Sequence, residues 1–262
     1  LALALRTPLA HMRAGAQILR LTAGPADRSR RTLDMMDRQL GHMVHLIDDL
    51  LDVARISQGK LALRRDRVRL REVLDSAVES SRPVIEAGGH ELVLDLPDEA
   101  LEIDADRTRL AQVIGNLLSN AAKYTPAGGR IALAAQREGP DAVIRVEDNG
   151  CGIAPEMLGR VFDMFVQGPE AAGRAQGGLG IGLSLARQLV EMHGGLIGVA
   201  SEGLGRGAVF QVRLPLADAQ EGHGLVPPAR PPAVAAPERL QVLVVDDNIE
   251  AAATLATMLG LL

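Results

Sequence analysis

Four polar residues within two turns of a predicted helix have the types and spacing to bind a metal–nucleotide complex. They are Asn116, Asn120, Lys123 and Tyr124, whose offsets of zero, four, seven and eight place them on one helical face. Asparagine suits helix interiors poorly because it competes for backbone hydrogen bonds, so two of them one turn apart suggest a task for their amide oxygens. Magnesium prefers hard oxygen ligands and usually shares them with phosphates. Lys123 could meet a phosphate and Tyr124 could cover a base or sugar, whereas a merely solvated polar face explains Lys123 well and the asparagines badly.

The stretch EDNGCGI, residues 147–153, suggests recognition of a base. Strand alternation puts Asp148 on one face with three small or apolar residues, Ala142, Ile144 and Val146, which predicts a buried carboxylate. A buried carboxylate needs a hydrogen-bond donor, and the exocyclic amine of adenine is one. Gly150 and Gly152 would let the chain turn closely around a ring. A bare D-x-G-x-G pattern is also found in ordinary turns.

The stretch QGGLGIGLSLARQL, residues 176–189, places glycines at a predicted helix start, where bare backbone N–H groups could approach an anion. Its spacing is not the dinucleotide fingerprint, no strand precedes it, and the Walker pattern is absent. Two interpretations stay open, a phosphate-binding segment or a tight turn for helix packing.

Composition narrows the class of ligand. The chain of 262 residues has a net charge of −5 and only 2% aromatic residues, which argues against nucleic acid as the ligand.

Cys151 is the only cysteine, which fits a reducing, cytoplasmic compartment. No run of 18 apolar residues appears, so no membrane span is predicted. Because the sequence begins at Leu1, we expect a fragment of a longer protein, which could carry a membrane anchor upstream.

Residues 1–59 are predicted to form an antiparallel helical hairpin. Its first helix carries apolar residues on heptad spacing at Leu5, Leu9, Met12, Ala16 and Leu19. Its second helix carries Leu33, Met36, Leu40, Met43, Ile47, Leu50 and Ala54 and ends near Gly59. Each helix has only a narrow apolar stripe, and two such stripes bury little apolar surface by themselves. We therefore expect a homodimer that completes a four-helix bundle.

Residues 60–217 predict an α+β domain with helices on one face of a mixed sheet. The pattern indicates a short strand and a helix over 68–89, a strand over 90–97, and a helix over 107–124 after an acidic turn at 104–106. A hairpin over 130–150 follows, then a polar loop, the Gly-rich helix and strands over 196–203 and 207–216.

Residues 218–239 contain five prolines and predict an extended linker. Residues 240–262 begin with an apolar strand that ends in Asp246 and Asp247, and they are too few to fold alone.

In this order, the segments NLLSNAAKYT, EDNGCGI, VFDMF and QGGLGIGL resemble the N, G1, F and G2 boxes of the histidine-kinase ATP-binding domain, which has the GHKL or Bergerat α/β sandwich fold. The helical pair with LRTPL at its start resembles the dimerisation and histidine-phosphotransfer domain, and LQVLVVDDN resembles the first strand of a response-regulator receiver. The chain thus resembles a hybrid sensor histidine kinase of a bacterial two-component system.

The resemblance implies ATP and Mg²⁺ as cofactors and a receiver domain, in cis or in trans, as partner. Asn120 would coordinate magnesium beside Asn116, and Lys123 and Tyr124 would hold phosphate and nucleotide. Asp148 would bind the adenine amine in a pocket shaped by Gly150 and Gly152. The other implied residues are Gly178, Gly180 and Gly182 at the phosphates, Phe162 and Phe165 near a lid of about 166–177, and Asp246 and Asp247 at an incomplete receiver magnesium site.

Asn116 stands where related ATPases of this fold place a glutamate that activates water. An amide cannot take that proton, so we expect slow hydrolysis of free ATP, which suits a kinase.

The phosphoacceptor box departs from the family pattern, which reads roughly H-E-L-R-T-P-L. Leu3 replaces the histidine and Ala4 its acidic partner, whereas Arg6, Thr7 and Pro8 match, and Thr7 could serve a phosphatase role. Leucine has no lone pair with which to attack phosphate, so the chain as written should not phosphorylate itself there. Other histidines, His11, His42 and His45, lack the LRTPL context, and His193 is predicted to end a helix. Three explanations of this departure remain: a fragment whose first residues are unreliable, an engineered substitution, or a true pseudokinase.

We therefore expect magnesium-dependent transfer of the ATP γ-phosphoryl group to a histidine and then to a receiver aspartate. An ATP-binding regulatory module without transfer, and a topoisomerase-like ATPase of this fold, are the alternatives.

Overall fold

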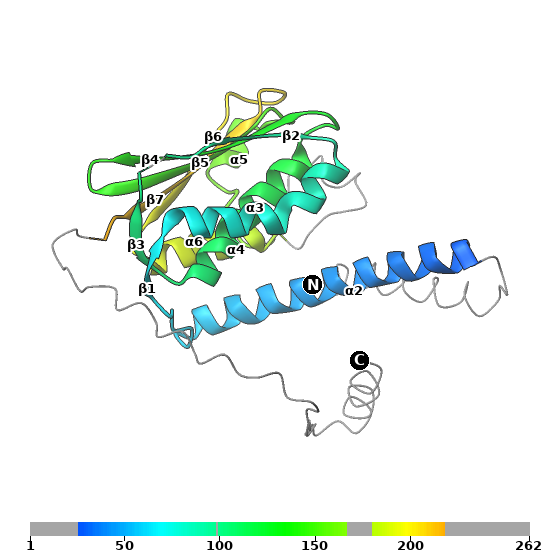
Figure 1. The fold of residues 1–262 in the computed structure, drawn as a ribbon, viewed down its shortest axis with the longest axis horizontal. Coiled ribbons are helices and arrows are strands. Elements are labelled where there is room, and N and C mark those ends of the chain that lie inside the picture. The colour runs from blue at the N-terminus through cyan, green and yellow to red at the C-terminus, as the bar shows by residue number, and fades with distance from the viewer. Residues whose placement is uncertain (1–25, 98, 167–179, 218–262) are drawn as a thin grey trace, which may run out of the picture. The chain divides into compact units, whose positions relative to one another are not determined.

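A computed structural model describes residues 26–97, 99–166 and 180–217. The helices are α2 (Ala26–Ser57), α3 (Leu70–Ala87), α4 (Arg107–Tyr124), α5 (Pro155–Leu158) and α6 (Gly182–Met192) (Figure 1). The strands are β1 (Asp66–Arg69), β2 (Glu91–Asp95), β3 (Glu102–Ala105), β4 (Arg130–Glu138), β5 (Asp141–Asp148), β6 (Leu196–Ala200) and β7 (Ala208–Pro215). The first predicted helix, the linker and the receiver-like segment lie outside the described residues.

The main sheet has five strands in the order β2-β4-β5-β7-β6. Strand β2 runs parallel to β4 and the other neighbours are antiparallel, so the sheet is mixed, as predicted. Strands β4 and β5 form the predicted hairpin, in which Ile131 pairs with Asp148 and the turn uses a positive φ of 63° at Gly139. A separate two-stranded sheet joins β1 and β3.

Helices α3, α4 and α6 cover one face of the main sheet (Figure 1). The apolar stripe predicted for α4 faces this core, and its four members, Leu110, Ile114, Leu117 and Ala121, are buried. On β5 the alternation predicted from the sequence also holds, since Ala142, Ile144 and Val146 are buried. The α+β fold class is therefore confirmed, and the packing of α4 turns its polar residues away from this core.

Two short elements were not predicted. Strand β3 occupies Glu102–Ala105, so the acidic stretch before α4 belongs partly to a strand, in which Asp104 pairs with Arg67. Only Asp106 acts on the helix, where its carboxylate caps α4 by accepting from the backbone N–H of Arg109 at 3.2 Å. The sequence offers only a short strand signal here, the alternation of Leu101, Ile103 and Ala105 with acidic residues, and all three of these apolar side chains are buried. The one-turn helix α5 begins with Pro155 at its first position.

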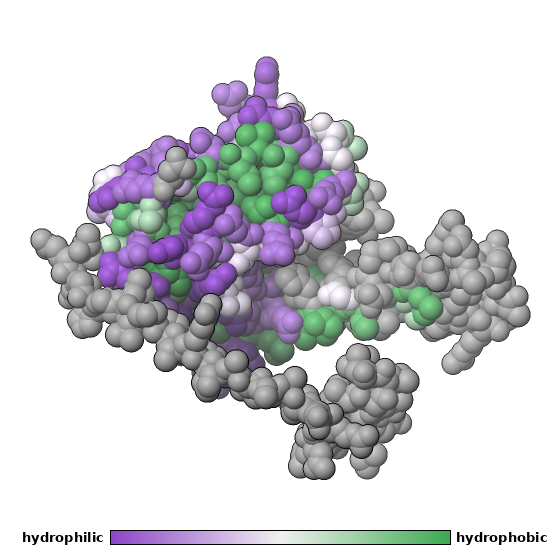
Figure 2. All heavy atoms as spheres, in the orientation of Figure 1, coloured by the Kyte–Doolittle hydropathy of each residue, from purple (hydrophilic) through white to green (hydrophobic). Residues whose placement is uncertain are grey.

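Helix α2 extends over 32 residues and ends, as predicted, just before Gly59, whose φ of 64° suits a helix C-terminal glycine. It has two different faces. Leu46, Asp49, Asp52 and Val53 are buried. Its exposed apolar residues, Leu33, Leu40, Val44, Ile47 and Leu51, form a stripe of which part is visible in Figure 2. Within the described residues, no helix combines the length and the apolar character that crossing a membrane requires.

Candidate nucleotide site

Helix α4 carries the four polar residues on one side, where each is half-buried. Asn116 lies at the contact of α4 with the start of α6, because its Nδ2 donates to the carbonyl oxygen of Gly182 at 3.4 Å. This bond leaves the Oδ1 atom of Asn116 as an acceptor, one turn before Asn120. The polar face of α4 and the Gly-rich helix start, which are 66 residues apart in the sequence, are therefore neighbours.

Lys123 and Tyr124 lie at the last turn of α4. The Nζ atom of Lys123 is 4.9 Å from the centroid of the Tyr124 ring, a cation–π distance. The carbonyl oxygen of Tyr124 accepts from the backbone N–H of Cys151 at 3.0 Å. This bond joins the end of α4 to the turn that follows β5, the strand that ends at Asp148.

Asp148 is buried at the end of β5, with 8% of its surface exposed, as the alternation predicted. Its Oδ1 accepts from the N–H of Gly150 at 2.9 Å. Burial is the main cause that raises the pKa of Asp148 above the ordinary aspartate value, with a smaller contribution from the charge of Glu147. This donor leaves acceptor capacity on the carboxylate for a ligand.

The glycines beside Asp148 are required by close backbone approaches. A Cβ atom at Gly150 would lie 2.5 Å from the carbonyl oxygen of Tyr124. Gly152 has a φ of 68°, and a Cβ there would lie 2.0 Å from the carbonyl oxygen of Gly203. The same holds for Gly207, which the sequence analysis missed, because its Cβ would lie 2.0 Å from the carbonyl oxygen of Asp148.

The Gly-rich segment is described from Gly180 onward. Gly180 has a φ of 71°, and its carbonyl oxygen accepts from the backbone N–H of Phe165 at 3.0 Å. Phe165 itself is exposed and has a positive φ of 65°, whereas Phe162 packs edge-on against Phe210 at 6.3 Å between ring centroids. Gly178 and most of the predicted lid lie outside the described residues.

Two family descriptions match this chain. The family "Histidine kinase-, DNA gyrase B-, and HSP90-like ATPase" matches residues 105–218, and the family "His Kinase A (phospho-acceptor) domain" matches residues 4–59. The chain belongs to the two-component sensor histidine kinases. It carries the two domains of a protein-histidine kinase core, one of which is an ATP-binding domain of the GHKL fold.

Curated relatives support this assignment. The histidine kinase is 37% identical over 214 residues to the alginate biosynthesis sensor protein KinB of Pseudomonas aeruginosa, a match that covers 81% of this chain and 35% of KinB. It is 38% identical over 216 residues to the histidine protein kinase DivJ of Caulobacter vibrioides, covering 81% of this chain and 36% of DivJ. The chain thus spans about a third of the length of these relatives.

Solved structures show the same fold. The structure of full-length ShkA in complex with AMPPNP is 30% identical, has a TM-score of 0.63, and aligns over 82% of this chain and 44% of that one. The histidine kinase AdeS of Acinetobacter baumannii is 20% identical with a TM-score of 0.61, over 82% of this chain and 98% of that one, which supports the fold alone.

Several candidate site residues predicted from the sequence lie outside the described residues. They are Leu3, Ala4, Thr7, His11, Gly178, Asp246 and Asp247. His193 follows α6, as predicted, but its ring has a further role. Its Nδ1–H donates to the carbonyl oxygen of Leu189 at 2.7 Å, and its Nε2 accepts from the backbone N–H of Asp106 at 3.0 Å. The buried ring thus fastens the end of α6 to the start of α4.

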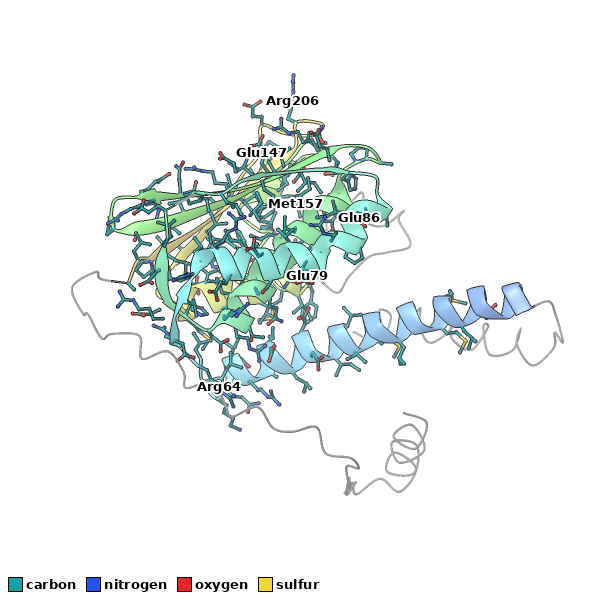
Figure 3. The ribbon with its side chains drawn as sticks, in the orientation of Figure 1. Arg64, Glu79, Glu86, Glu147, Met157 and Arg206 are labelled. Carbon is teal, nitrogen blue, oxygen red and sulfur yellow. The ribbon has the colours of Figure 1, made fainter. Side chains whose placement is uncertain are left out.

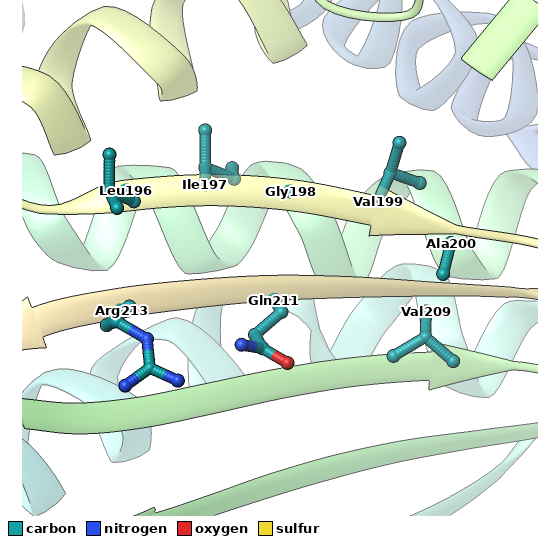
Figure 4. Close-up of a pocket in the computed structure, with 8 residues that line it drawn as sticks. All are labelled: Leu196, Ile197, Gly198, Val199, Ala200, Val209, Gln211 and Arg213. Atoms are coloured by element: carbon teal, nitrogen blue, oxygen red, sulfur yellow. The ribbon is translucent and has the colours of Figure 1, made fainter. Parts of the chain in front are cut away.

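A hollow of about 370 Å³ on the kinase is not part of this site. It lies along edge strand β6 and the outer side of β7 (Figure 4). Its one charged lining residue, Arg213, is already paired with Glu138 and Asp141. Among the described residues, no group of three or more histidine, cysteine or acidic side chains forms a metal site.

Proposed function

We propose that this kinase core transfers the γ-phosphoryl group of ATP to a protein histidine, from which it passes to a receiver aspartate. The observation that supports the proposal is that three segments far apart in the sequence are in contact. The polar face of α4 contacts the start of α6 through Asn116, and the end of α4 is bonded to the turn after Asp148.

In the proposed complex, Asp148 accepts a hydrogen bond from the 6-amino group of adenine. Gly150 and Gly152 shape the pocket by letting the turn after β5 pack closely, because a side chain at either position would collide with neighbouring carbonyl oxygens. Lys123 and Tyr124 contact the phosphates and the nucleoside. The start of α6, with Gly180 and Gly182, presents backbone N–H groups to the phosphates, and we extend this role to Gly178.

The donor set of α4 fits magnesium, because amide oxygens are hard ligands and the Oδ1 of Asn116 is not used by the bond to Gly182. Asn120 would hold the ion, with Asn116 beside it. The ion would neutralise phosphate charge during transfer. Asn116 cannot accept a proton from water, so the site should keep the phosphoryl group for a protein nucleophile.

The decisive experiment restores the phosphoacceptor box. The double variant L3H/A4E is incubated with γ-labelled Mg·ATP next to the unaltered chain. We expect acid-labile, base-stable label on the variant only, because leucine and alanine supply neither a nucleophile nor a base. The triple variant with D148N added is the control that should lose the label. A restored box that stays unlabelled would contradict the proposed transfer.

We further propose the domain organisation: a dimerisation and phosphotransfer hairpin at 1–59, the ATP-binding domain at 60–217, a linker at 218–239 and the start of a receiver at 240–262. The exposed stripe of α2 supports a homodimer through the hairpin. The motif LQVLVVDDN supports the receiver, with Asp246 and Asp247 as its magnesium ligands. The need for ATP and the single cysteine favour the cytoplasm for this core.

Thr7 is proposed to assist dephosphorylation. One relative, LuxQ of Vibrio parahaemolyticus, is named a sensor kinase/phosphatase and is 32% identical over 253 residues.

A further inference from the structure

The loop between β6 and β7, residues 201–207, is bonded to the turn that follows Asp148. The N–H of Gly205 donates to the carbonyl oxygen of Cys151 at 2.7 Å, and the N–H of Gly207 donates to that of Gly150 at 3.2 Å. Arg206, at the tip of this loop, points away from the sheet in Figure 3. The loop therefore contacts the base-recognition turn through its backbone and leaves its long side chain outside.

Ser201 supplies the one side-chain hydroxyl in these contacts. Its Oγ accepts from the N–H of Ile153 at 3.0 Å and from the N–H of Gly203 at 3.3 Å. Its O–H is directed to the carbonyl oxygen of Gly207 at 2.6 Å, with a longer approach of 3.4 Å to that of Gly203. A serine hydroxyl has one proton and two lone pairs, so its hydrogen-bonding capacity is fully used.

The bond to Gly207 continues to Asp148 through two further hydrogen bonds. The N–H of Gly207 donates to the carbonyl oxygen of Gly150, and the N–H of Gly150 donates to the Oδ1 of Asp148. Gly207 and Gly150 are both buried, so water does not compete for these bonds. Because linked hydrogen bonds strengthen one another, the Ser201 hydroxyl supports the donor that Asp148 receives.

We propose that Ser201 is a positioning residue for adenine recognition. Its hydroxyl fixes Gly207, which is bonded to Gly150, and the N–H of Gly150 orients the Asp148 carboxylate toward the 6-amino group of the base. Ser201 itself touches neither nucleotide nor metal. The inference rests on the adenine-binding role proposed for Asp148 and adds a residue from a segment that none of the sequence motifs included.

A purely structural serine would behave differently. If Ser201 only kept the loop folded, its loss would weaken binding of every nucleotide to the same degree. If it orients Asp148, its loss should weaken the binding of purines that carry the 6-amino group and spare those without it. The contrast between ATP and purine riboside 5′-triphosphate, which lacks only that group, separates the two roles.

The experiment measures dissociation constants of both Mg·nucleotides by calorimetry on the full chain and on S201A. We expect S201A to bind ATP about tenfold more weakly, since one hydrogen bond to a charged group is disturbed, and to bind the analogue within about twofold of the unaltered chain. S201T retains a hydroxyl and should restore ATP binding. The matched control is S81A, which removes a buried hydroxyl in α3 and should change neither constant.

Equal losses for both nucleotides in S201A, or no loss for either, would overturn the role of Ser201. A different result concerns Asp148: if the unaltered chain binds ATP and the analogue equally well, Asp148 does not recognise the amine, and its proposed adenine-binding role falls together with that of Ser201, whereas phosphoryl transfer is tested separately by the labelling of L3H/A4E. Circular dichroism checks folding. If S201A does not fold, S201C keeps the volume with a weak donor and should show the same selective loss.

Discussion

Asp148 combines burial with incomplete use of its acceptors. A buried carboxylate needs donors, and the backbone N–H of Gly150 supplies one. The remaining acceptor capacity of the carboxylate fits the role in ligand recognition that we propose for Asp148. At the residue scale, predictions about nucleotide binding therefore centre on this side chain.

Replacing Asp148 by asparagine should lower the affinity for Mg·ATP by about tenfold or more. The amide keeps the size of the side chain but loses the charge, and hydrogen bonds to charged groups contribute about 1.5–3 kcal/mol. Calorimetry measures the change. The matched control is E147Q, because Glu147 lies next in the strand but is exposed on the other side of the sheet (Figure 3). A D148N protein that binds like E147Q would remove Asp148 from the site.

The affinity for ATP should also depend on pH through Asp148. Its pKa is raised by burial, so the carboxylate gains a proton at a higher pH than the ordinary value of about 3.9. Protonation removes the negative acceptor that the amine needs. ATP affinity should therefore stay level near neutral pH and fall as the pH decreases through the raised pKa, and D148N should lack this fall.

Calorimetry over a pH series tests this dependence. Purine riboside triphosphate, which has the same phosphates, corrects for their own titration. A fall of equal size for both nucleotides would assign the effect to the phosphates.

At the scale of elements, helix α4 is the common support of the site. Asp106 caps its start and Asn116 contacts α6. Two further contacts hold the helix. The ring of His193, after α6, accepts a hydrogen bond from the N–H of Asp106. The carboxylate of Asp52 in α2 accepts hydrogen bonds from the two terminal guanidinium nitrogens of Arg109. The position of the polar face of α4 thus also depends on contacts outside the proposed nucleotide site.

His193 should make the stability of the domain depend on pH. Burial lowers the pKa of its imidazole, with the charge of Arg65 acting in the same direction, so the folded protein keeps the ring neutral. The unfolded chain binds a proton more readily, near pH 6.5. The stabilising effect is complete above about pH 6.5 and is lost as the pH falls toward the lower folded pKa.

Urea unfolding from pH 7.5 to 5 measures this effect. H193Q should show a weaker pH dependence in that range. An identical pH profile for H193Q would show that another group causes the loss.

The pair of Arg109 and Asp52 should stabilise the contact of α4 with α2. The Asp52 side chain is only 7% exposed, so R109M, which keeps the apolar stem, would leave a buried carboxylate without its main donor. We expect a loss of about 1–3 kcal/mol in the free energy of unfolding.

The control is R107M on the same helix. The pair of Arg107 and Glu72 has side chains 54% and 48% exposed, so its loss should cost under about 0.5 kcal/mol. Chemical denaturation compares the two. Equal effects would mean that burial does not decide the strength of the pair.

At the scale of the whole molecule, α2 has more apolar surface than the described chain covers. Leu33, Leu40, Val44, Ile47 and Leu51 are each more than two-fifths exposed and follow heptad spacing. Such a stripe is typical of a helix that packs against further helices, and a second copy of the hairpin would supply them.

Replacing Val44 by glutamate should therefore shift the protein from dimer to monomer, because the charge would be buried in the bundle. Sedimentation equilibrium gives the mass. The control is L196E, which places the same charge at an exposed leucine on β6 and should leave the dimer intact. A V44E protein that remains dimeric would place the interface elsewhere.

The sequence determined the features that depend on neighbours along the chain. Helical spacing put Asn116, Asn120, Lys123 and Tyr124 on one face, and strand alternation buried Asp148, because side-chain direction repeats locally with a period of 3.6 or 2 residues. The same reasoning missed β3, whose four residues offer too short a pattern, and α5, a single turn.

Only the tertiary structure decided which distant segments meet. The bonds of Asn116 to Gly182, of His193 to Asp106, and of Ser201 to Ile153 join residues that share no local pattern. They arise because β7 lies between β5 and β6 in the sheet and because α6 packs on α4. Periodicity could thus place the candidate ligand-binding residues on their helix or strand faces, whereas the residues that hold them in place follow from strand order and helix packing.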